Sequence, residues 1–200
     1  MITGIDFQIL DFLQQHCRTQ GLDKIFSTIT HLGDAGIIWI LLAAALLLIP
    51  KTRRCGIVVS IALILDLILC NGILKNLVAR IRPFDVNTAV ELLIQKPSDY
   101  SFPSGHTAAS FAAVTALYCT HSRLRYPAFC VALLIAFSRM YLYVHYPSDI
   151  LGGVLLGVIC GCAAAQIFRV RLRRWNQKRQ PDICPSSCTG SCQSCPGNKQ

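Results

Sequence analysis

Five long apolar stretches decide what this chain can fold into. They cover residues 36–50, 55–74, 107–119, 126–144 and 150–168, and the last holds no charged residue. Only 14% of the 200 residues are charged, whereas a soluble domain has about 25%. A soluble fold of this size needs more polar surface than the chain supplies, so the pattern predicts an integral membrane protein.

The length of the stretches predicts helices that cross the membrane. Spanning the hydrocarbon layer takes about 20 helical residues, so 36–50 and 107–119 need their flanking residues to complete a span. We therefore predict an all-α, polytopic transmembrane helix bundle of five to six spans. The first residues show neither the basic start nor the cleavage site of a signal peptide.

Residues 1–34 have a different pattern. Apolar residues recur at helical spacing from Ile5 to Leu13, with acids and glutamines between them, which is typical of an interfacial helix. A second segment, 22–32, meets a predicted break at Gly33–Asp34, and is either a half-helix in the outer leaflet or a sixth span. The predicted organisation is an N-terminal segment (1–34), a transmembrane core (35–172) and a basic, then cysteine-rich, disordered tail (173–200).

The placement of the basic residues predicts the orientation in the cell membrane. Twelve of the 19 Lys and Arg residues fall in two connections and the tail, all on one side of the predicted layout. Cytoplasmic loops carry such an excess, so the tail is expected in the cytoplasm and the loop 84–102 outside. The chain has a net charge of +9, but its charged residues lie between apolar stretches, which argues against a nucleic-acid partner.

The first of three polar clusters is Lys75 with Arg82-Pro83. Residues seven apart share one face of a helix, about 10.5 Å apart along its axis. Such cations can simply snorkel to the membrane interface. However, these two lie on the predicted outer side, where the positive-inside bias leaves few Lys and Arg residues. A functional role is therefore an equal alternative.

The second cluster is Pro103-Ser104-Gly105-His106, at the start of a predicted span. Ser104 is a favourable N-cap, Gly105 allows close approach to the backbone, and a helix N-terminus favours a bound anion. An ordinary capped helix start has the same pattern. His106 favours chemistry, because an imidazole beside an anion can shuttle a proton.

The third cluster is Ser138-Arg139, His145 and Asp149. A charge inside an apolar helix is costly and usually functional, which applies to Arg139. Pro147 is suited to open the final helix, which places Asp149 in its first turn beside His145. A carboxylate fixes the tautomer of such an imidazole and stabilises its positive charge, although an interfacial His–Asp hydrogen bond without chemistry fits too.

In order, the clusters read Lys-x6-Arg-Pro, Pro-Ser-Gly-His and Ser-Arg-x5-His-x3-Asp. This resembles the type 2 phosphatidic acid phosphatase (PAP2) superfamily, which includes membrane lipid phosphatases and vanadium haloperoxidases. The resemblance implies that His145 is the nucleophile that forms a phosphohistidine, that Asp149 orients it, and that His106 is the general acid. It further implies a set of phosphate-binding groups: Lys75, Arg82, Arg139, Ser104 and the Gly105 N–H.

The resemblance to small bacterial members implies a lipid phosphate substrate taken from the bilayer. Undecaprenyl diphosphate ranks first, and phosphatidylglycerophosphate and phosphatidic acid are alternatives. Fixed cations and a helix N-terminus can neutralise the phosphate, so we expect neither a cofactor nor a metal ion. A non-catalytic membrane protein or an anion permease is the alternative from another class, although a permease should carry polar residues through the depth of several spans. The oligomeric state is left open.

Two features fall outside these clusters. Asp66 lies within an apolar stretch, where we expect a buried hydrogen bond to another span or, less favoured, a proton relay. Four cysteines in the tail are either incidental in a disordered segment or ligands of a metal ion: Cys184, Cys188, Cys192 and Cys195.

Overall fold

The computed structural model describes residues 2–179, and all regular structure in that range is helical. The predicted all-α fold is therefore confirmed for this part of the chain. In order, the elements are α1 (Ile2–His16), α2 (Gln20–Leu32), the 3₁₀ turn η1 (Asp34–Gly36), α3 (Ile37–Leu48), α4 (Arg53–Asp66), the π-helix η2 (Leu67–Leu74), α5 (Lys75–Val78), α6 (Pro83–Val86), α7 (Gly105–Cys119), α8 (Arg125–Tyr141) and α9 (Pro147–Arg179). Residues up to Phe168 form one compact unit, and a second unit begins at Arg169.

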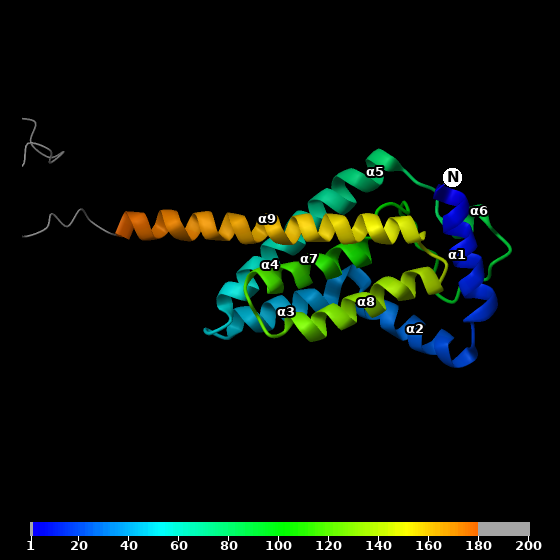
Figure 1. Ribbon diagram of the computed structural model, residues 1–200, viewed down its shortest axis with the longest axis horizontal. Coiled ribbons are helices and arrows are strands. Elements are labelled where there is room, and N and C mark those ends of the chain that lie inside the picture. Colours follow the sequence, from blue (N-terminus) through cyan, green and yellow to red (C-terminus); the bar gives the residue numbers. More distant parts are fainter. Residues whose placement is uncertain (1, 180–200) are drawn as a thin grey trace, which may run out of the picture. The chain divides into compact units, whose positions relative to one another are not determined.

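Helix α7 lies at the centre of the first unit. It packs against α4 on one side and α8 on another, while α3 packs against α4 (Figure 1). Its sequence is rich in alanine, and Ala108, Ala112 and Ala116 are completely buried. Small side chains let neighbouring helices approach closely, so the start of α7 is held within the bundle.

Glycines at every fourth position let α9 approach α7 just as closely. A Cβ atom on Gly153 would lie 2.8 Å from the Ser104 carbonyl oxygen, and one on Gly157 would lie 2.5 Å from that of Ala108. This approach brings the first turns of the two helices together, and the Ser104 N–H donates to the Asp149 carbonyl oxygen at 3.2 Å. Two sequence clusters that are about forty residues apart thereby become neighbours.

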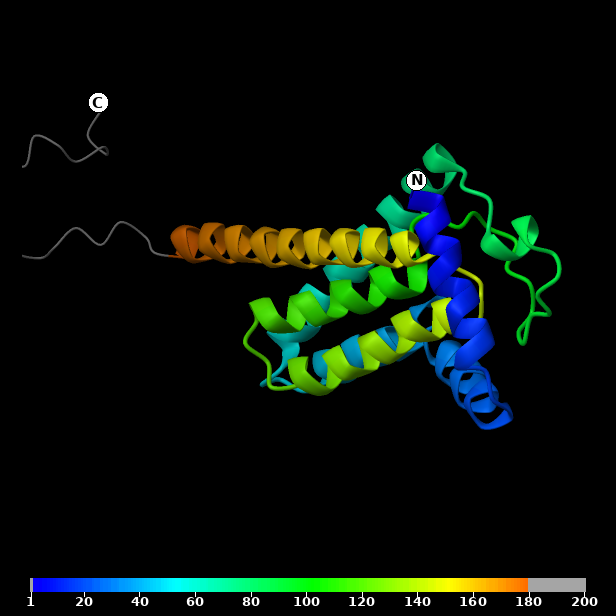
Figure 2. The same cartoon turned by 45° about the vertical axis from the view of Figure 1, so that its right-hand side comes forward.

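The two N-terminal helices cover one end of this bundle. Helix α1 lies across the end at which α8 stops and α9 begins (Figures 1 and 2). Its inner face buries Leu10, whereas Ile5 and Phe12 are exposed on the other face. The predicted amphipathic helix is present, and its placement in the membrane interface stays a prediction.

The predicted break at Gly33–Asp34 is confirmed. Helix α2 ends at Leu32, and Ala35 and Gly36 take positive φ angles of 50° and 67° before α3 starts. The left-handed region is unfavourable for alanine, so the neighbouring structure must hold this turn. The helical segments on its two sides are bent by 44°.

Two described stretches are long and apolar enough to span a membrane by length and composition, Arg53–Val86 and Pro147–Trp175. The bent pair Gln20–Leu32 and Asp34–Leu48 makes a third if it is one broken span. Helices α7 and α8 have 15 and 17 residues, and 15 residues rise only about 22 Å. The described helices thus supply two to three candidate spans. Most of the predicted tail, including its four cysteines, lies outside the described residues.

Candidate active site

The three sequence clusters meet at the end of the bundle that α1 covers. They surround a cavity of about 540 Å³. Six of the eight predicted site residues line it: Lys75, Arg82, Gly105, His106, Arg139 and His145. The other two, Ser104 and Asp149, are completely buried. Residues from three distant parts of the sequence therefore form one site.

His145 lies in the connection between α8 and α9, with its two ring nitrogens facing different groups. Nδ1 lies 3.5 Å from Asp149 Oδ2, and Nε2 lies 3.3 Å from Arg82 Nη1. Nδ1 has no hydrogen-bond partner among the described residues, so the carboxylate is near without being bonded to the ring. Burial, followed by the cations of Arg82 and Arg139, holds the pKa of His145 well below its ordinary value. The imidazole is thus neutral and carries a lone pair at the cation-lined end of the cavity.

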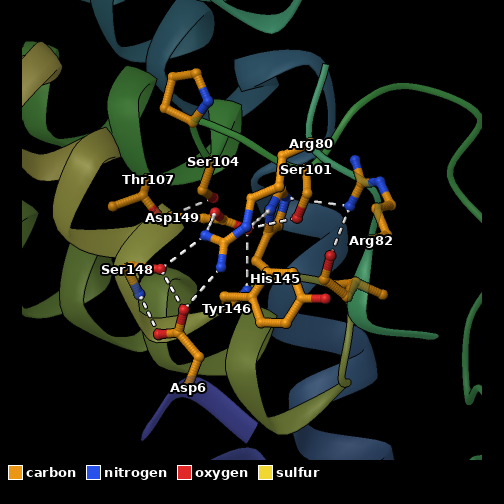
Figure 3. Close-up of polar contacts among 12 residues, drawn as sticks. Asp6, Arg80, Arg82, Ser101, Ser104, Thr107, His145, Tyr146, Ser148 and Asp149 are labelled. Atoms are coloured by element: carbon orange, nitrogen blue, oxygen red, sulfur yellow. Dashed lines mark hydrogen bonds and ion pairs between the residues drawn. The ribbon is translucent and has the colours of Figure 1, made fainter. Parts of the chain in front are cut away.

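Asp149 is held by an arginine outside the three motifs. Arg80 Nη1 lies 2.6 Å from Asp149 Oδ1, and the Ser101 hydroxyl and the Tyr146 N–H donate to Oδ2 (Figure 3). The guanidinium group of Arg80 also stacks over the Tyr146 ring, 3.9 Å from its centroid. A buried carboxylate with this many partners is fixed in position, so it can steer His145.

The same arginine ties helix α1 to the site. Arg80 Nη2 lies 2.8 Å from Asp6 Oδ2, and Asp6 accepts hydrogen bonds from both the N–H and the hydroxyl of Ser148 (Figure 3). Sequence reasoning missed Arg80, Asp6 and Ser148. Arg80 had a signal, because in the predicted layout it is a further cation on the side that the positive-inside bias leaves poor in Lys and Arg.

Lys75 and Arg82 do not share a helix face, so that expectation was wrong. Helix α5 ends at Val78 because Ala79 turns left-handed, and Arg82 takes an extended conformation, as residues before proline do. Both cations nevertheless reach the same carboxylate. Asp99 accepts from Lys75 Nζ and, at 2.5 Å, from Arg82 Nη2. Burial raises the pKa of Asp99, but these ion pairs outweigh it and hold the pKa well below its ordinary value.

Arg139 is a buried cation that donates a side-chain hydrogen bond to a hydroxyl group. Its Nη1 donates to Thr30 Oγ1 at 2.6 Å, and its Nε has no partner among the described residues. No carboxylate of residues 2–179 lies within ion-pair distance of it. A buried, unpaired guanidinium is costly, so this arrangement is suited to bind an anion.

Ser104 occupies the predicted N-cap position of α7, but its side chain does not cap the helix. Its hydroxyl instead accepts a hydrogen bond from Thr107 Oγ1 at 3.0 Å. A Cβ atom on Gly105 would lie 3.5 Å from Lys75 Nζ, so the glycine backbone borders the cation. The first N–H groups of a helix lack intrahelical acceptors, and here they begin at the wall of the cavity.

A larger cavity of about 980 Å³ adjoins the first and shares Lys75, Gly105 and His106 with it. It is lined mainly by apolar side chains of α3, α4 and η2, as far as Leu47 and Leu63. Asp66 also lines it, and Asp66 Oδ1 has no hydrogen-bond partner among the described residues. The expected hydrogen bond from Asp66 to another span is therefore not made by Oδ1 within residues 2–179.

Comparison with known proteins decides the family. The model of the PAP2 superfamily matches residues 55–173. The chain belongs to the PAP2 superfamily. All eight predicted site residues fall inside the PAP2 match, as does Arg80, whereas Asp6, Thr30 and Asp34 precede it.

Several relatives of the chain are named as phosphatases that act on lipid phosphates. An undecaprenyl-diphosphatase from Sulfolobus acidocaldarius is 36% identical over 131 residues, which is 65% of this chain and 63% of that protein. Phosphatidylglycerophosphatase B from Bacillus subtilis is 30% identical over 175 residues, 80% of this chain and 82% of the relative. The crystal structure of Aquifex aeolicus LpxE superimposes with a TM-score of 0.70 at 29% identity, covering 80% of this chain and 94% of LpxE. The chain spans just under two thirds of the length of the Sulfolobus protein.

Proposed function

We propose that this protein is a membrane lipid phosphatase that works through a phosphohistidine intermediate. The observation that carries the proposal is the setting of His145: a neutral, buried imidazole has Asp149 near one nitrogen and the phosphate-binding cations near the other. The lone pair on Nε2 is directed to where the cations would hold a phosphorus atom. Asp149 then stabilises the positive charge that the ring develops.

In the first half-reaction, His145 Nε2 forms a bond to phosphorus as the bond from phosphorus to the leaving oxygen breaks. His106 gives its proton to that oxygen, and the lipid alcohol or lipid phosphate departs. In the second half-reaction, water attacks phosphorus and loses a proton to His106. The bond from Nε2 to phosphorus breaks, inorganic phosphate is released, and both histidines return to their starting states.

The cations bind the phosphoryl group throughout. Lys75 and Arg82 share an ion pair with Asp99, so a phosphate dianion must replace that carboxylate. Arg139 has an Nε–H group without a hydrogen-bond partner among the described residues, which can donate to the phosphate. Phosphoryl transfer depends on positioning and on neutralising charge spread over the phosphoryl oxygens. Three cations and the start of α7 can supply this, so we propose that turnover needs no metal ion. The residues 2–179 contain no group of three or more acidic, His or Cys side chains suited to a metal.

Undecaprenyl diphosphate is the proposed substrate. The apolar cavity of about 980 Å³ lined by α3 and α4 reaches Lys75, Gly105 and His106, and it could take part of a long hydrocarbon chain while the headgroup lies among the cations. The Sulfolobus relative supports a prenyl diphosphate. Phosphatidylglycerophosphate is the second candidate, because the B. subtilis relative aligns over more of both chains.

We further propose that five or six spans cross the membrane, with the site outside and the C-terminal tail in the cytoplasm. The bias of the basic residues supports this orientation. Antibody should reach an epitope tag inserted in 84–102 on intact cells, but a tag at Gln200 only after permeabilisation. Detection of both tags on intact cells would contradict the layout.

The decisive experiment is phosphate release by the detergent-purified protein. Undecaprenyl diphosphate, phosphatidylglycerophosphate and phosphatidic acid are each offered in the presence of EDTA. We expect release from at least one, fastest from undecaprenyl diphosphate, and loss of release in His145→Ala. The matched control is His121→Ala, which removes an exposed histidine of the α7–α8 connection. Phosphate binding without any release would instead favour a non-catalytic protein or an anion permease.

A further inference from the structure

A carboxylate outside the PAP2 match faces the second histidine of the site. Asp34 Oδ1 lies 3.0 Å from His106 Nε2, and Asp34 Oδ2 lies 2.7 Å from Nδ1 of His31. The side chains are 19% exposed for His106, 47% for Asp34 and 65% for His31. All three line the smaller cavity. Asp34 thus lies between the largely buried side chain of His106 and the exposed side chain of His31.

The backbone around Asp34 is shaped for this contact. A Cβ atom on Gly33 would lie 2.7 Å from His106 Cδ2, so only glycine lets the turn approach the imidazole. The two residues after Asp34 have positive φ angles, which is an unfavourable conformation for Ala35. The turn between α2 and α3 therefore accepts strain while it brings a carboxylate to His106.

The groups around His106 disfavour a positive charge on its ring, which a nearby carboxylate can counteract. Burial disfavours a positive charge on the ring, Arg139 and Lys75 repel it as well, and His145 lines the same cavity. A general acid must nevertheless hold its proton until the leaving oxygen takes it. Asp34 is the only carboxylate of residues 2–179 within ion-pair distance of His106, so it offsets the repulsion.

We propose that Asp34 is a positioning residue for the general acid, an inference that rests on the proposed function. Asp34 accepts the Nε2–H of His106, which orients the ring and stabilises the imidazolium form. The proton on Nδ1 then goes to the leaving oxygen as its bond to phosphorus breaks, and the ring becomes neutral. When water attacks the phosphohistidine, Nδ1 takes a proton back, and Asp34 again faces an imidazolium ion.

The test compares Asp34→Asn with the unchanged protein on two substrates that differ in leaving group. Asparagine keeps the shape but loses the negative charge. A lipid phosphomonoester expels a poor alkoxide and needs the proton, whereas an aryl phosphate expels a stable phenolate. We expect kcat on the lipid ester to fall about tenfold or more, as is usual when general acid catalysis is weakened. KM should be unchanged, and kcat on the aryl ester should change by less than about threefold. Asp34→Glu should restore part of the kcat lost on the lipid ester.

The matched control is Asp23→Asn, which removes another N-terminal carboxylate, one that accepts a hydrogen bond from the Tyr141 hydroxyl. It should affect both substrates alike. In a His106→Ala background, Asp34→Asn should cause no further loss on the lipid ester, since the group it positions is gone. Variants are compared as monodisperse fractions from size-exclusion chromatography.

Equal losses on the two substrates, or no loss on either, would overturn the role of Asp34, as would an additive loss in the double variant. If Asp34→Asn does not yield a monodisperse fraction, Asp34→Glu decides, because a displaced carboxylate must still slow the lipid ester more than the aryl ester. An unchanged protein that releases phosphate from neither of these substrates nor from undecaprenyl diphosphate would instead refute the proposed function.

Discussion

The surroundings of His145 and of His106 differ in how firmly each is enclosed. The side chain of His145 is 2% exposed, and its carboxylate neighbour Asp149 is 0% exposed. His106 lies at the cavity wall, and its partner Asp34 is about half exposed, on a strained turn. A nucleophile must be held in the orientation for attack on phosphorus before the substrate binds. A general acid, in contrast, must reach the leaving oxygen of substrates that differ in size. The contrast therefore matches the two proposed roles.

The largest effect is expected from His145→Ala. Without the nucleophile no phosphohistidine forms, so turnover of lipid and aryl phosphates alike should fall by about 1,000-fold or more. Steady-state phosphate release on both substrates measures this. If the variant keeps substantial aryl phosphatase activity, His145 is not the nucleophile and the two surroundings have been assigned the wrong roles.

His106→Ala should separate the two surroundings further. Loss of a general acid costs about 100-fold or more when the leaving group is poor, so the lipid phosphomonoester should suffer most. The aryl phosphate should retain more of its rate, because its phenolate leaves without a proton. Kinetics on both esters, with folding followed by size exclusion, provide the measurement. Equal losses would mean that His106 holds the phosphate rather than protonating the leaving group.

Arg80→Ala probes how much of the rigidity around His145 comes from one side chain. It leaves the buried carboxylates of Asp6 and Asp149 without their shared cation, a situation that costs about 3–5 kcal/mol. We expect a lower unfolding temperature in detergent and a loss of activity on both esters. Arg80→Lys is the matched variant and should recover part of the stability. An unchanged melting temperature in Arg80→Ala would show that the network does not support the site.

The smallest effect concerns the pH dependence of stability. Because burial and the nearby cations lower the pKa of His145 in the folded protein, the ring takes up its proton at a lower pH in the fold than in the unfolded chain, where protonation occurs near pH 6.5. The unfolded state then binds the extra proton, so this residue makes stability fall as the pH drops from 7 to 5. Replacing His145 removes its contribution to the pH dependence of stability. The melting temperature of His145→Gln relative to the unchanged protein should therefore rise as the pH drops across this range. A constant difference would indicate an ordinary pKa for His145.

The local pattern of the sequence was enough for much of the site. Short motifs marked Lys75, Arg82, His106, Arg139 and His145, and the structure places them around one cavity. The start of α9 at Pro147 and the break after Leu32 also follow from local chemistry, since proline and glycine act on their own neighbours. The start of α7 at Gly105 was placed correctly, although the Ser104 side chain does not form the expected cap. The family followed from the order and spacing of the same motifs.

Only the tertiary structure could decide which charged groups meet. Asp6, Asp34 and Asp99 carry no local pattern that distinguishes them from other acids, yet each contacts a group of the site: Arg80, His106 and the pair Lys75 and Arg82. These contacts join residues as many as 74 positions apart, and they depend on how α1, the α2–α3 turn and the 87–101 loop pack against the bundle. The sequence indicated the proposed reacting residues, because short local motifs carry them. The packing of distant segments decided which carboxylates lie beside those residues, because such contacts depend on the whole fold.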